Sequence, residues 1–378
     1  MSLRIAIDAS RATATQPTGT ETYALRLIQA LIHANEGLAQ PFRFCLYFRD
    51  QPAAGLFEPS EFVEQTTIPL PRMWTHLRLA AALWRRRHDL LFVPAHTLPF
   101  AFPGRAIVTA HDLGYKHFPG AHPSMQRLYL DATTRYSQAR ASIVLADSHA
   151  TAADLTRFYG TPRHKIRVIY PGVAAARLAA SPDQVHAVRI KYQLPQRYFL
   201  FLGTLQPRKN IARLAQAFAQ WQAATANSET ALVLAGGRGW LFDEAWLDGA
   251  SNLRQTGYIT EADKAALLAG ALALVFPSLH EGFGFPVVEA MHCGTPVIAS
   301  STSSLPELVG DCGILVDPLD AADIAAAMRR ISEDERLRSE LGAQGRARAQ
   351  RFNWKTAALQ TLDAFAELDG DLRYNQLV

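Results

Sequence analysis

The segment SLHEGFGFPVVEAMHCGTPVIAS, residues 278–300, decides the class of fold. It follows an apolar run at 273–277 that is typical of a buried strand. A glycine-containing loop comes next, and Pro286 suits the first position of a helix, where its missing N–H costs no hydrogen bond. Gly294 stands where a helix commonly ends, and PVIAS resumes a strand. The segment therefore predicts a strand–loop–helix–strand unit of a parallel sheet.

The same alternation extends toward both ends of the chain. Strand-like apolar runs recur, with helical patterns between several of them, at 3–8, 42–48, 89–94, 106–110, 142–146, 198–203, 231–237 and 313–318. A Pro-, Ala- and Gly-rich stretch at 170–182 divides them. We therefore predict an α/β protein with two doubly wound, Rossmann-like domains, a hinge near 172–190 and a cleft between the domains. Beyond Asp320 we expect helix, interrupted near Gly342 and Gly345.

The composition excludes several classes of protein. Of 378 residues, 49% are hydrophobic and 19% charged, as in a globular chain rather than a disordered one. No apolar stretch approaches the ~20 residues of a membrane span, and no signal peptide is visible. The net charge is only +4, without a dense basic tract, so we expect no nucleic-acid partner. These observations predict a cytoplasmic protein.

Two glutamates flank the glycine-containing loop. Glu281 lies in the loop, and Glu289 lies about one turn into the predicted helix. The backbone N–H groups of residues 283–287, together with the helix dipole, would favour a bound anion. Glu289 could then accept hydrogen bonds from a ribose diol, and Glu281 from a sugar ring. In the alternative interpretation Glu289 only favours a helix N-terminus and Glu281 is solvated, but the GFGFP loop between them favours a binding site.

A basic pair lies in FLGTLQPRKNIARLAQAF, residues 199–218. A strand is predicted to end at Gly203, and Arg208 and Lys209 precede a helix that Asn210 would cap. The pair could be an ordinary solvated turn. If it lies beside the 278–300 segment, the two cations could instead neutralise a diphosphate leaving group, which is otherwise the work of a magnesium ion.

Other clusters indicate less. The spacing of His111, His117 and His122 allows a metal-site interpretation, but histidines are common in loops and cores, so we expect no metal and no other cofactor. Asp147, Ser148 and a following histidine are consecutive, so their side chains diverge and a hydrolytic triad is not expected. Ser148 is expected instead to cap the next helix.

The motifs GTLQPRKNI, GYITEADK, HEGFGFPVVEA and GTPVIAS together resemble those of a retaining glycosyltransferase of family 4 (glycosyltransferase group 1), of a mannosyltransferase-like kind, over nearly the whole chain. The resemblance implies the GT-B fold. It implies an acceptor-binding domain at 1–175, a nucleotide-sugar-binding domain at 176–359, and a C-terminal helix, 360–378, that crosses back to the first domain.

The resemblance also implies roles for residues of the second domain. Arg208 and Lys209 match the basic pair that holds the donor diphosphate. Glu281 matches the glutamate that binds hydroxyls of the transferred sugar, and Glu289 the one that binds the ribose. Backbone amides that reach the sugar and the phosphate oxygens are matched by Phe283, Gly284 and Phe285.

Further residues match the remainder of the donor site. Tyr258 and Ile259 match the residues that hold the base, while Gly19 and Thr20 match a loop that approaches donor phosphate and acceptor. His111 matches a histidine near the reacting sugar, so that the catalytic residues implied are His111, Glu281 and Lys209. Many relatives have two glycines in the first loop, whereas this chain reads Thr18–Gly19–Thr20, and some relatives have an arginine where Thr204 stands here.

The segment RMWTHLRLAAALWRRR, residues 72–87, allows two interpretations. At helical spacing Trp74, Leu77, Ala81 and Trp84 share one face, and arginines surround it. Such a helix could rest on an anionic membrane that presents a lipid-linked acceptor, which would place the protein at the inner face of the membrane. The alternative is a core-facing helix with arginines near its C-terminal end, and this is the interpretation that we favour.

The resulting hypothesis is a metal-independent retaining hexosyltransferase (EC 2.4.1 type). It would move mannose from GDP-mannose onto a hydroxyl of a glycan or a lipid-linked oligosaccharide during surface polysaccharide synthesis. The partners would be the nucleotide-sugar donor and that acceptor. Alternatives are a glucosyltransferase that uses UDP-glucose, a sugar-nucleotide epimerase, and a non-catalytic binder of nucleotide sugars. A dinucleotide-dependent oxidoreductase is disfavoured because no strand-to-helix turn carries a full GxGxxG.

Overall fold

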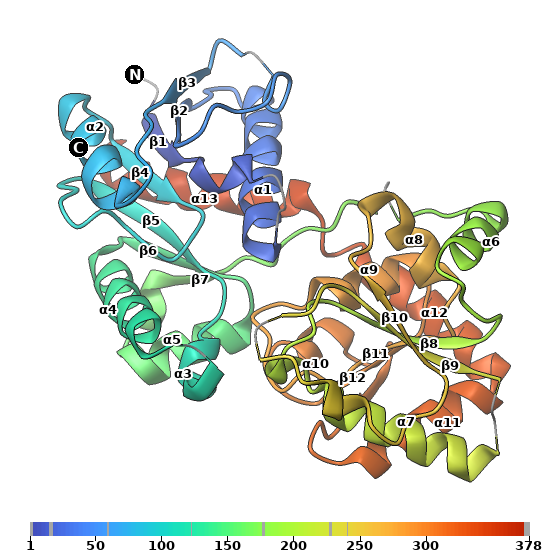
Figure 1. Cartoon of the computed structure of the whole chain (residues 1–378). Coiled ribbons are helices and arrows are strands. Elements are labelled where there is room, and N and C mark those ends of the chain that lie inside the picture. Colours follow the sequence, from blue (N-terminus) through green and yellow to red (C-terminus); the bar gives the residue numbers. More distant parts are fainter. Residues whose placement is uncertain are drawn as a thin grey trace. The chain divides into compact units, whose positions relative to one another are not determined.

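The protein consists of two compact units, each built around one parallel sheet (Figure 1). The computed structural model describes residues 3–14, 18–58, 60–121, 123–175, 178–226, 229–239 and 241–373. Unit 1 comprises Met1–Lys116, His122–Gly172 and Asn353–Val378, and unit 2 comprises His117–Ala121 and Val173–Phe352. Apart from the short segment His117–Ala121, the chain leaves unit 1 after Gly172 and returns to it at Asn353. Within the described residues, no helix is long and apolar enough to cross a membrane.

Unit 1 is centred on a seven-stranded sheet in the order β3-β2-β1-β4-β5-β6-β7, with every pair parallel. Parallel strands require crossover connections, which explains why strands and helices alternate along the sequence. The strands are β1 (Arg4–Asp8), β2 (Arg43–Phe48), β3 (Val63–Thr67), β4 (Leu90–Val93), β5 (Arg105–Ala110), β6 (Ile143–Ala146) and β7 (Ile166–Val168).

The longest connections of this sheet are helical. They comprise α1 (Gly19–Glu36), α2 (Ala80–Arg85), α3 (Gly114–His117), α4 (Ser124–Arg140) and α5 (His149–Tyr159), with a π-helical turn η2 (Trp74–Leu79) and the short 3-10 helices η1 (Ser10–Thr13), η3 (Pro119–Ala121) and η4 (Arg163–Lys165). Ser148 caps α5 as predicted, because its Oγ accepts from the Thr151 amide at 3.0 Å.

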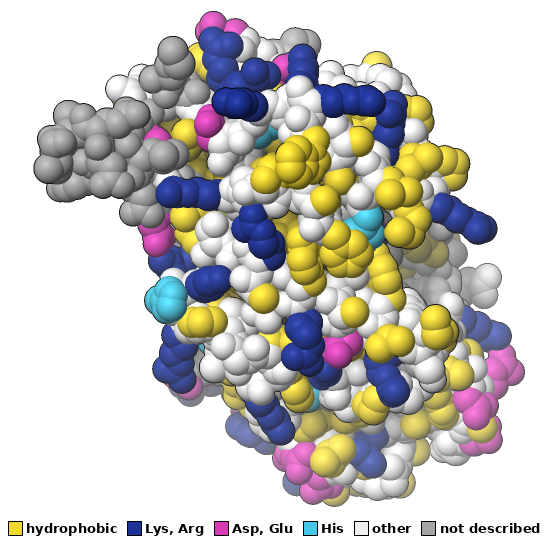
Figure 2. Space-filling view, turned by 90° about the vertical axis from the view of Figure 1, so that its left-hand side faces the viewer, with side chains coloured by type: hydrophobic (Ala, Val, Ile, Leu, Met, Phe, Trp, Pro, Cys, Tyr) yellow, Lys and Arg dark blue, Asp and Glu magenta, His cyan; other side chains and the backbone are white. Residues whose placement is uncertain are grey.

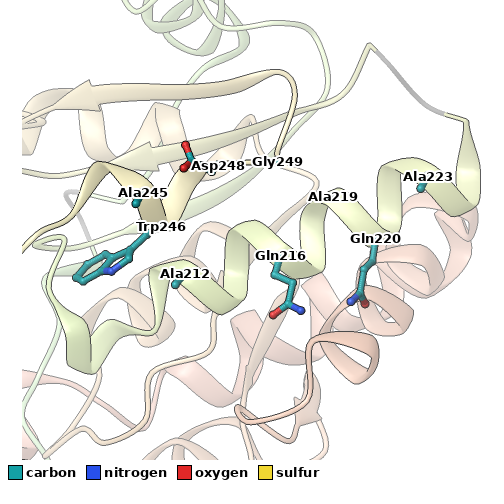
Figure 3. A pocket seen from close by; sticks show the side chains of 9 residues that line it. All are labelled: Ala212, Gln216, Ala219, Gln220, Ala223, Ala245, Trp246, Asp248 and Gly249. Carbon is teal, nitrogen blue, oxygen red and sulfur yellow. The ribbon is translucent and has the colours of Figure 1, made fainter.

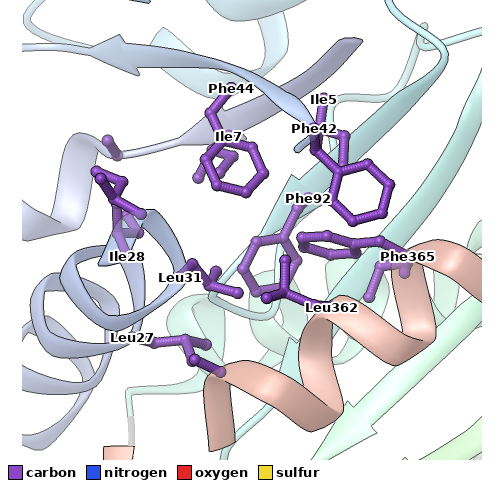
Figure 4. Close-up of a cluster of buried hydrophobic side chains, with 14 of the residues drawn as sticks. Ile5, Ile7, Leu27, Ile28, Leu31, Phe42, Phe44, Phe92, Leu362 and Phe365 are labelled. Atoms are coloured by element: carbon purple, nitrogen blue, oxygen red, sulfur yellow. The ribbon is translucent and has the colours of Figure 1, made fainter. Parts of the chain in front are cut away.

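The C-terminal helix α13 (Trp354–Arg373) completes the core of unit 1 (Figure 4). Phe365 is fully buried and meets Phe92 of β4 edge to face, with ring centroids 5.3 Å apart. Leu362 and Phe365 share one buried cluster with Leu27 and Leu31 of α1. The last segment of the chain therefore packs in the N-terminal core, as burial of its apolar face requires.

Unit 2 has a six-stranded parallel sheet in the order β10-β9-β8-β11-β12-β13. Its strands are β8 (Tyr198–Leu202), β9 (Ala231–Ala235), β10 (Leu253–Gly257), β11 (Ala273–Phe276), β12 (Val297–Ser300) and β13 (Ile314–Val316). Its helices are α6 (Pro182–Lys191), α7 (Ile211–Thr225), α8 (Glu261–Ala269), α9 (Phe285–Cys293), α10 (Leu305–Val309), α11 (Ala321–Glu333) and α12 (Glu335–Ala349), with the 3-10 helices η6 (Pro207–Lys209) and η7 (Glu244–Leu247). The predicted fold class, two Rossmann-like α/β sheets, is confirmed.

One expectation about unit 2 is wrong: α12 runs without interruption through Gly342 and Gly345. The reason for a glycine inside the helix is close packing. A Cβ on Gly342 would lie 2.4 Å from the carbonyl oxygen of Gly294, the residue that ends α9. Helix α12 therefore lies directly against the C-terminus of α9, and only glycine permits that approach.

Candidate active site

The order of strands in unit 2 places its candidate residues. The chain runs outward from β8 to β9 and β10, and then returns to β11 on the other side of β8. In open parallel sheets, ligands bind beyond the carboxyl ends of the strands at such a switch point. The loop after β8 carries Arg208 and Lys209, and the loop after β11 carries Glu281. Residues 72 positions apart are therefore brought to one place by topology.

Lys209 and Glu281 form a buried ion pair there. The Lys209 Nζ lies 2.6 Å from Glu281 Oε1, and the two residues are 8% and 6% exposed. Burial would raise the pKa of Glu281, but the charges of Lys209 and Arg208 outweigh it and hold the pKa below its ordinary value. Glu281 is thus an ionised hydrogen-bond acceptor at neutral pH. Lys209 Nζ also lies 4.9 Å from the centroid of the Phe276 ring.

Arg208 links the two loops rather than projecting away from them. Its Nη1 donates to the carbonyl oxygen of His280 at 2.6 Å and to Glu281 Oε2 at 3.2 Å. The backbone reinforces this link, since the Leu279 amide donates to the carbonyl oxygen of Arg208 at 2.9 Å. The basic pair is therefore not an ordinary solvated turn, because both cations are organised around one carboxylate.

Asn210 occupies the position before α7, as predicted, but its side chain does not cap that helix. It has a left-handed backbone, with φ 61°, and its Nδ2 donates to the carbonyl oxygens of Pro277 at 3.1 Å and Pro318 at 2.6 Å. The predicted cap is thus wrong in its contacts. The amide instead fastens the loop of Arg208 and Lys209 to the residues that follow β11 and β13, the two strands on either side of β12.

The backbone of the Glu281 loop is held by two serines that follow β12. The Glu281 amide donates to Ser303 Oγ, and Ser304 Oγ donates to the carbonyl oxygen of Glu281, both at 3.0 Å. These contacts fix the loop independently of the ion pair. Nothing in the sequence pattern had indicated Ser303 or Ser304, because a serine in a loop carries no signal of its partner.

Helix α9 begins directly after this loop. Its first turn requires Gly284, which has φ 119° and whose Cβ, if present, would lie 2.8 Å from Leu305 Cδ2. Phe283 is buried against Phe285, with ring centroids 5.1 Å apart. The expected row of backbone donors at 283–287 is shorter than predicted. Pro286 carries no N–H, and the Val287 amide donates to the carbonyl oxygen of Gly284 at 3.0 Å.

Glu289 points to a second lysine that the sequence interpretation had missed. Lys264 of α8 lies 2.7 Å from Glu289 Oε1 and 2.8 Å from Glu261 Oε1. Burial raises the pKa of Glu289, and the charge of Lys264 opposes that rise. The signal was present in the motif GYITEADK, but no spacing rule connects Lys264 with a glutamate 25 residues later.

Tyr258 and Ile259 follow β10 at the edge of the sheet and precede α8. The Tyr258 side chain is 68% exposed, while Ile259 is buried. They are connected to α9 through α8, whose Lys264 reaches Glu289.

A groove on unit 2 lies apart from these residues (Figure 3). Its volume is about 590 Å³, and it runs between α7 and η7. The lining is mostly small or uncharged, with Ala212, Ala219, Trp246 and Asp248 among its residues. It contains none of the candidate residues and offers a single charge, so it does not suit a diphosphate.

Unit 1 has its own switch point, between β1 and β4. Gly19 begins α1 after β1, and Thr20 follows it; Thr18 forms a capping box with Glu21. The Thr18 amide donates to Glu21 Oε2 at 3.1 Å. This box satisfies helix-terminal groups with side chains, so Gly19 and Thr20 lie at a helix start whose conformation is fixed.

His111 follows β5 and is buried beside an aspartate that the sequence had not linked to it. Its Nδ1 lies 2.7 Å from Asp147 Oδ2, and its Nε2 lies 3.3 Å from the carbonyl oxygen of Pro94. Burial would lower the pKa of His111, but Asp147 outweighs burial and the pKa is raised. The rings of Tyr23 and His96 lie edge-on to His111, at 4.7 and 5.2 Å between centroids.

The pKa of the neighbouring His96 is shifted in the opposite direction. Burial, reinforced by the charge of His111, lowers its pKa to about 3. His96 is therefore a neutral imidazole at neutral pH, and it lies beside a histidine whose pKa is shifted upward. Of the three histidines whose spacing allowed a metal-site interpretation, His111 is engaged by Asp147, and His122 lies outside the described residues.

Comparison with known proteins defines the class to which these two units belong. A family model described as glycosyltransferase family 4 matches residues 17–177, and one described as glycosyl transferases group 1 matches residues 187–348. The chain is 34% identical over 267 residues to the O-antigen chain mannosyltransferase B of Escherichia coli, covering 69% of this chain and 70% of that protein. The chain is a glycosyltransferase. It belongs to the group 1 glycosyltransferases.

Two further similarities extend this result. The serotype-specific mannosyltransferase WbdA of E. coli is 29% identical over 289 residues, covering 73% of this chain and 34% of WbdA, so the chain spans about a third of that relative. The sucrose-phosphate synthase of Thermosynechococcus elongatus has a TM-score of 0.76 at 24% identity, covering 98% of this chain and all of that one. The latter likeness shows the GT-B fold.

Proposed function

We propose that the protein transfers mannose from GDP-mannose, with retention of configuration, to a hydroxyl of a glycan or lipid-linked oligosaccharide during synthesis of a surface polysaccharide. The names of the E. coli relatives support mannose and a polysaccharide product. The observation that carries the proposal is the buried Lys209–Glu281 pair, joined by the partly buried Arg208, at the switch point of unit 2.

The donor would bind at this cluster and at helix α9. Lys209 and Arg208 would face the diphosphate, and the N-terminus of α9 would add the positive end of its dipole. Phe283, Gly284 and Phe285 would supply the backbone donors that the resemblance implies. Because two cations and a helix terminus supply positive charge, we propose that the reaction needs no metal ion.

The two glutamates would bind hydroxyl groups. Glu281 is ionised, so it can accept hydrogen bonds from the transferred sugar while Lys209, with three N–H donors, turns one of them toward phosphate. Glu289 would accept from the ribose diol, held in place by Lys264. Tyr258 and Ile259 would hold the base, and Gly19, Thr20 and His111 would keep the roles that the resemblance implies for unit 1.

The chemistry would be a front-face displacement. The acceptor oxygen forms a bond to the anomeric carbon while the bond from that carbon to the diphosphate oxygen breaks. The proton of the acceptor hydroxyl passes to the departing diphosphate on the same face, so the products are the glycoside and GDP. Glu281 is not placed as a nucleophile here, because both its oxygens are engaged by cations. Catalysis would then rest on positioning and on stabilising leaving-group charge.

A transfer assay with a panel of sugar nucleotides and mannose-containing acceptors tests the proposal. GDP-mannose should be consumed only with acceptor, and NMR of the product should show the anomeric configuration of the donor. Lys209→Ala and Glu281→Ala should each lower turnover about 10²–10³-fold, whereas Lys191→Ala, which removes a surface ion pair, should not. Conversion of the donor without acceptor would indicate an epimerase, and binding without turnover would indicate a non-catalytic binder. Transfer from UDP-glucose would indicate a glucosyltransferase. Near-normal turnover in either active-site variant would refute the assigned roles.

A further inference from the structure

The segment 72–87 divides its side chains between core and solvent. Trp74 is buried and donates its Nε1–H to the carbonyl oxygen of Ile68 at 2.7 Å, while Leu77 and Trp84 are 59% and 62% exposed. The prediction that Trp74, Leu77, Ala81 and Trp84 share one face is therefore wrong. The π-helical turn at Trp74–Leu79 has more residues per turn than an α-helix, so the predicted 3.6-residue spacing does not apply. The favoured core-facing interpretation holds for the buried residues of the segment, among them Trp74, Leu79 and Leu83.

The exposed side chains of this segment continue into two other elements of unit 1. The His76 ring stacks on Phe100 with centroids 4.0 Å apart, and His76 Nε2 lies 3.2 Å from the hydroxyl of Tyr129. Trp84 Nε1 donates to the carbonyl oxygen of Ala101. On α4, Met125 and Leu128 precede Tyr129 at helical spacing. We call the following exposed residues the apolar patch: Met73, Leu77, Trp84, Phe100, Met125, Leu128 and Tyr129.

Positive charge predominates around the apolar patch. The three segments that form it, residues 68–88, 94–104 and 123–130, contain six arginines and no aspartate or glutamate: Arg72, Arg78, Arg85, Arg86, Arg87 and Arg127. Arg86 is paired with Glu64 from outside these segments. The next acidic residue along α4, Asp131, pairs with Lys116. Figure 2 views this side of unit 1 and shows hydrophobic side chains lying among Lys and Arg side chains.

We propose that the apolar patch docks unit 1 on an anionic lipid bilayer. Tryptophan and tyrosine favour the boundary between headgroups and acyl chains, because each has an apolar ring and a polar group. Arginines beside them meet lipid phosphates. The inference goes beyond the proposed function and does not depend on it, since it concerns a surface of unit 1 and no residue of the donor site.

The charges argue against a second copy of the chain as the occupant. A symmetric contact would place the same patch on both subunits, so the arginines of one copy would face those of the other. A bilayer rich in phosphatidylglycerol offers negative charge to the arginines of these segments. It also offers an apolar interior to the exposed rings and aliphatic chains of the patch. Exposed apolar surface rimmed by charge is typical of interaction sites.

Flotation of the full-length protein with vesicles tests this inference. The protein should float with vesicles that contain phosphatidylglycerol and much less with pure phosphatidylcholine, and added salt should release it. Arg78→Gln with Arg85→Gln and Arg87→Gln should weaken the partition coefficient about fivefold per arginine, or about a hundredfold together. Leu77→Ser with Leu128→Ser should weaken it at every salt concentration.

Matched variants on unit 2 serve as controls. Ile190→Ser with Leu319→Ser removes two side chains that are 64% and 66% exposed, and Arg329→Gln with Arg336→Gln removes exposed arginines. Neither pair should alter flotation, and thermal midpoints will show that every variant is folded. The inference would be overturned if the protein bound neutral vesicles as well as anionic ones, or did not bind vesicles at all. It would also be overturned if the control variants lost as much binding as the patch variants, or if the protein formed a dimer that Leu77→Ser dissociates. Nucleotide is absent throughout, so these outcomes are separate from failure of the transferase proposal.

Discussion

Replacing Lys209 with methionine should destabilise unit 2 markedly, because it leaves the Glu281 carboxylate in a buried site with fewer counter-charges. Lys209 Nζ is 2.6 Å from Glu281 Oε1, and both residues are less than a tenth exposed. Removing one partner of a buried pair costs about 3–5 kcal/mol. Arg208 remains 3.2 Å from Oε2, so we expect a value near the lower end, about 3 kcal/mol.

Differential scanning calorimetry measures this effect. For a unit of this size, about 3 kcal/mol corresponds to a fall in the midpoint of unfolding of about 6–12 °C. Lys209→Met combined with Glu281→Gln should recover much of that loss, because the double variant buries no unpaired carboxylate and the introduced amide can still accept from Arg208. Lys191→Met is the matched control, since it removes a lysine whose ion pair with Asp263 is at the surface.

The double-mutant comparison decides the outcome. Strong coupling between positions 209 and 281 is expected, with the double variant more stable than Lys209→Met alone. If the single and double variants lost the same stability, or if Lys209→Met unfolded at the wild-type midpoint, the buried pair would not exist as described. The reasoning on leaving-group charge would then lose its structural basis.

Three further predictions concern pH and backbone geometry. The pKa of Glu281 is lowered from 4.5 on folding, so its contribution to stability is complete above pH 4.5 and is lost as the pH falls through the folded pKa. Glu281→Gln should therefore flatten the acid side of the profile of stability against pH. Urea titrations at successive pH values will show this. The pKa of His111 is raised above 6.5, so its contribution to stability is present below pH 6.5 and is lost as the pH rises through the folded pKa. Asp147→Asn should shift the NMR titration of the His111 ring to lower pH. An unchanged titration would contradict the pairing of His111 with Asp147. Gly284→Ala should lower the midpoint of thermal unfolding by more than Gly249→Ala does. Both glycines have positive φ, but a Cβ at 284 would also meet Leu305, whereas nothing lies within 4 Å of a Cβ at 249. Equal midpoints would show that α9 tolerates a side chain at 284.

The sequence was sufficient to predict the fold class. Apolar runs that end in Gly, Pro or Ser and alternate with helical patterns indicate parallel α/β sheets, whichever side chains the following loops carry. Gly294 correctly marked the end of α9. Gly342 misled the prediction because glycine in a helix can mean either a break or a close contact. The contact is with Gly294, which is distant in sequence and invisible to local pattern.

The candidate site was predictable in its residues but not in its pairings. Motifs marked Lys209, Glu281 and Glu289, yet the partners Lys264 and Asp147 became evident only when the sheets brought their elements together. Asp147 had been considered only beside its sequence neighbours, whereas its carboxylate reaches His111 across adjacent strands β5 and β6. Local spacing reports which side chains share an element, and the order of strands decides which elements meet.

The most direct test of the central claim is calorimetric titration of the protein with a panel of sugar nucleotides in excess EDTA, with and without a mannose-containing acceptor. The account predicts saturable binding of GDP-mannose without metal, weakened in Lys209→Met and in Glu289→Gln but unchanged in Lys191→Met. Absence of binding by every member of the panel under both conditions, or binding that these two active-site variants leave intact, would contradict it.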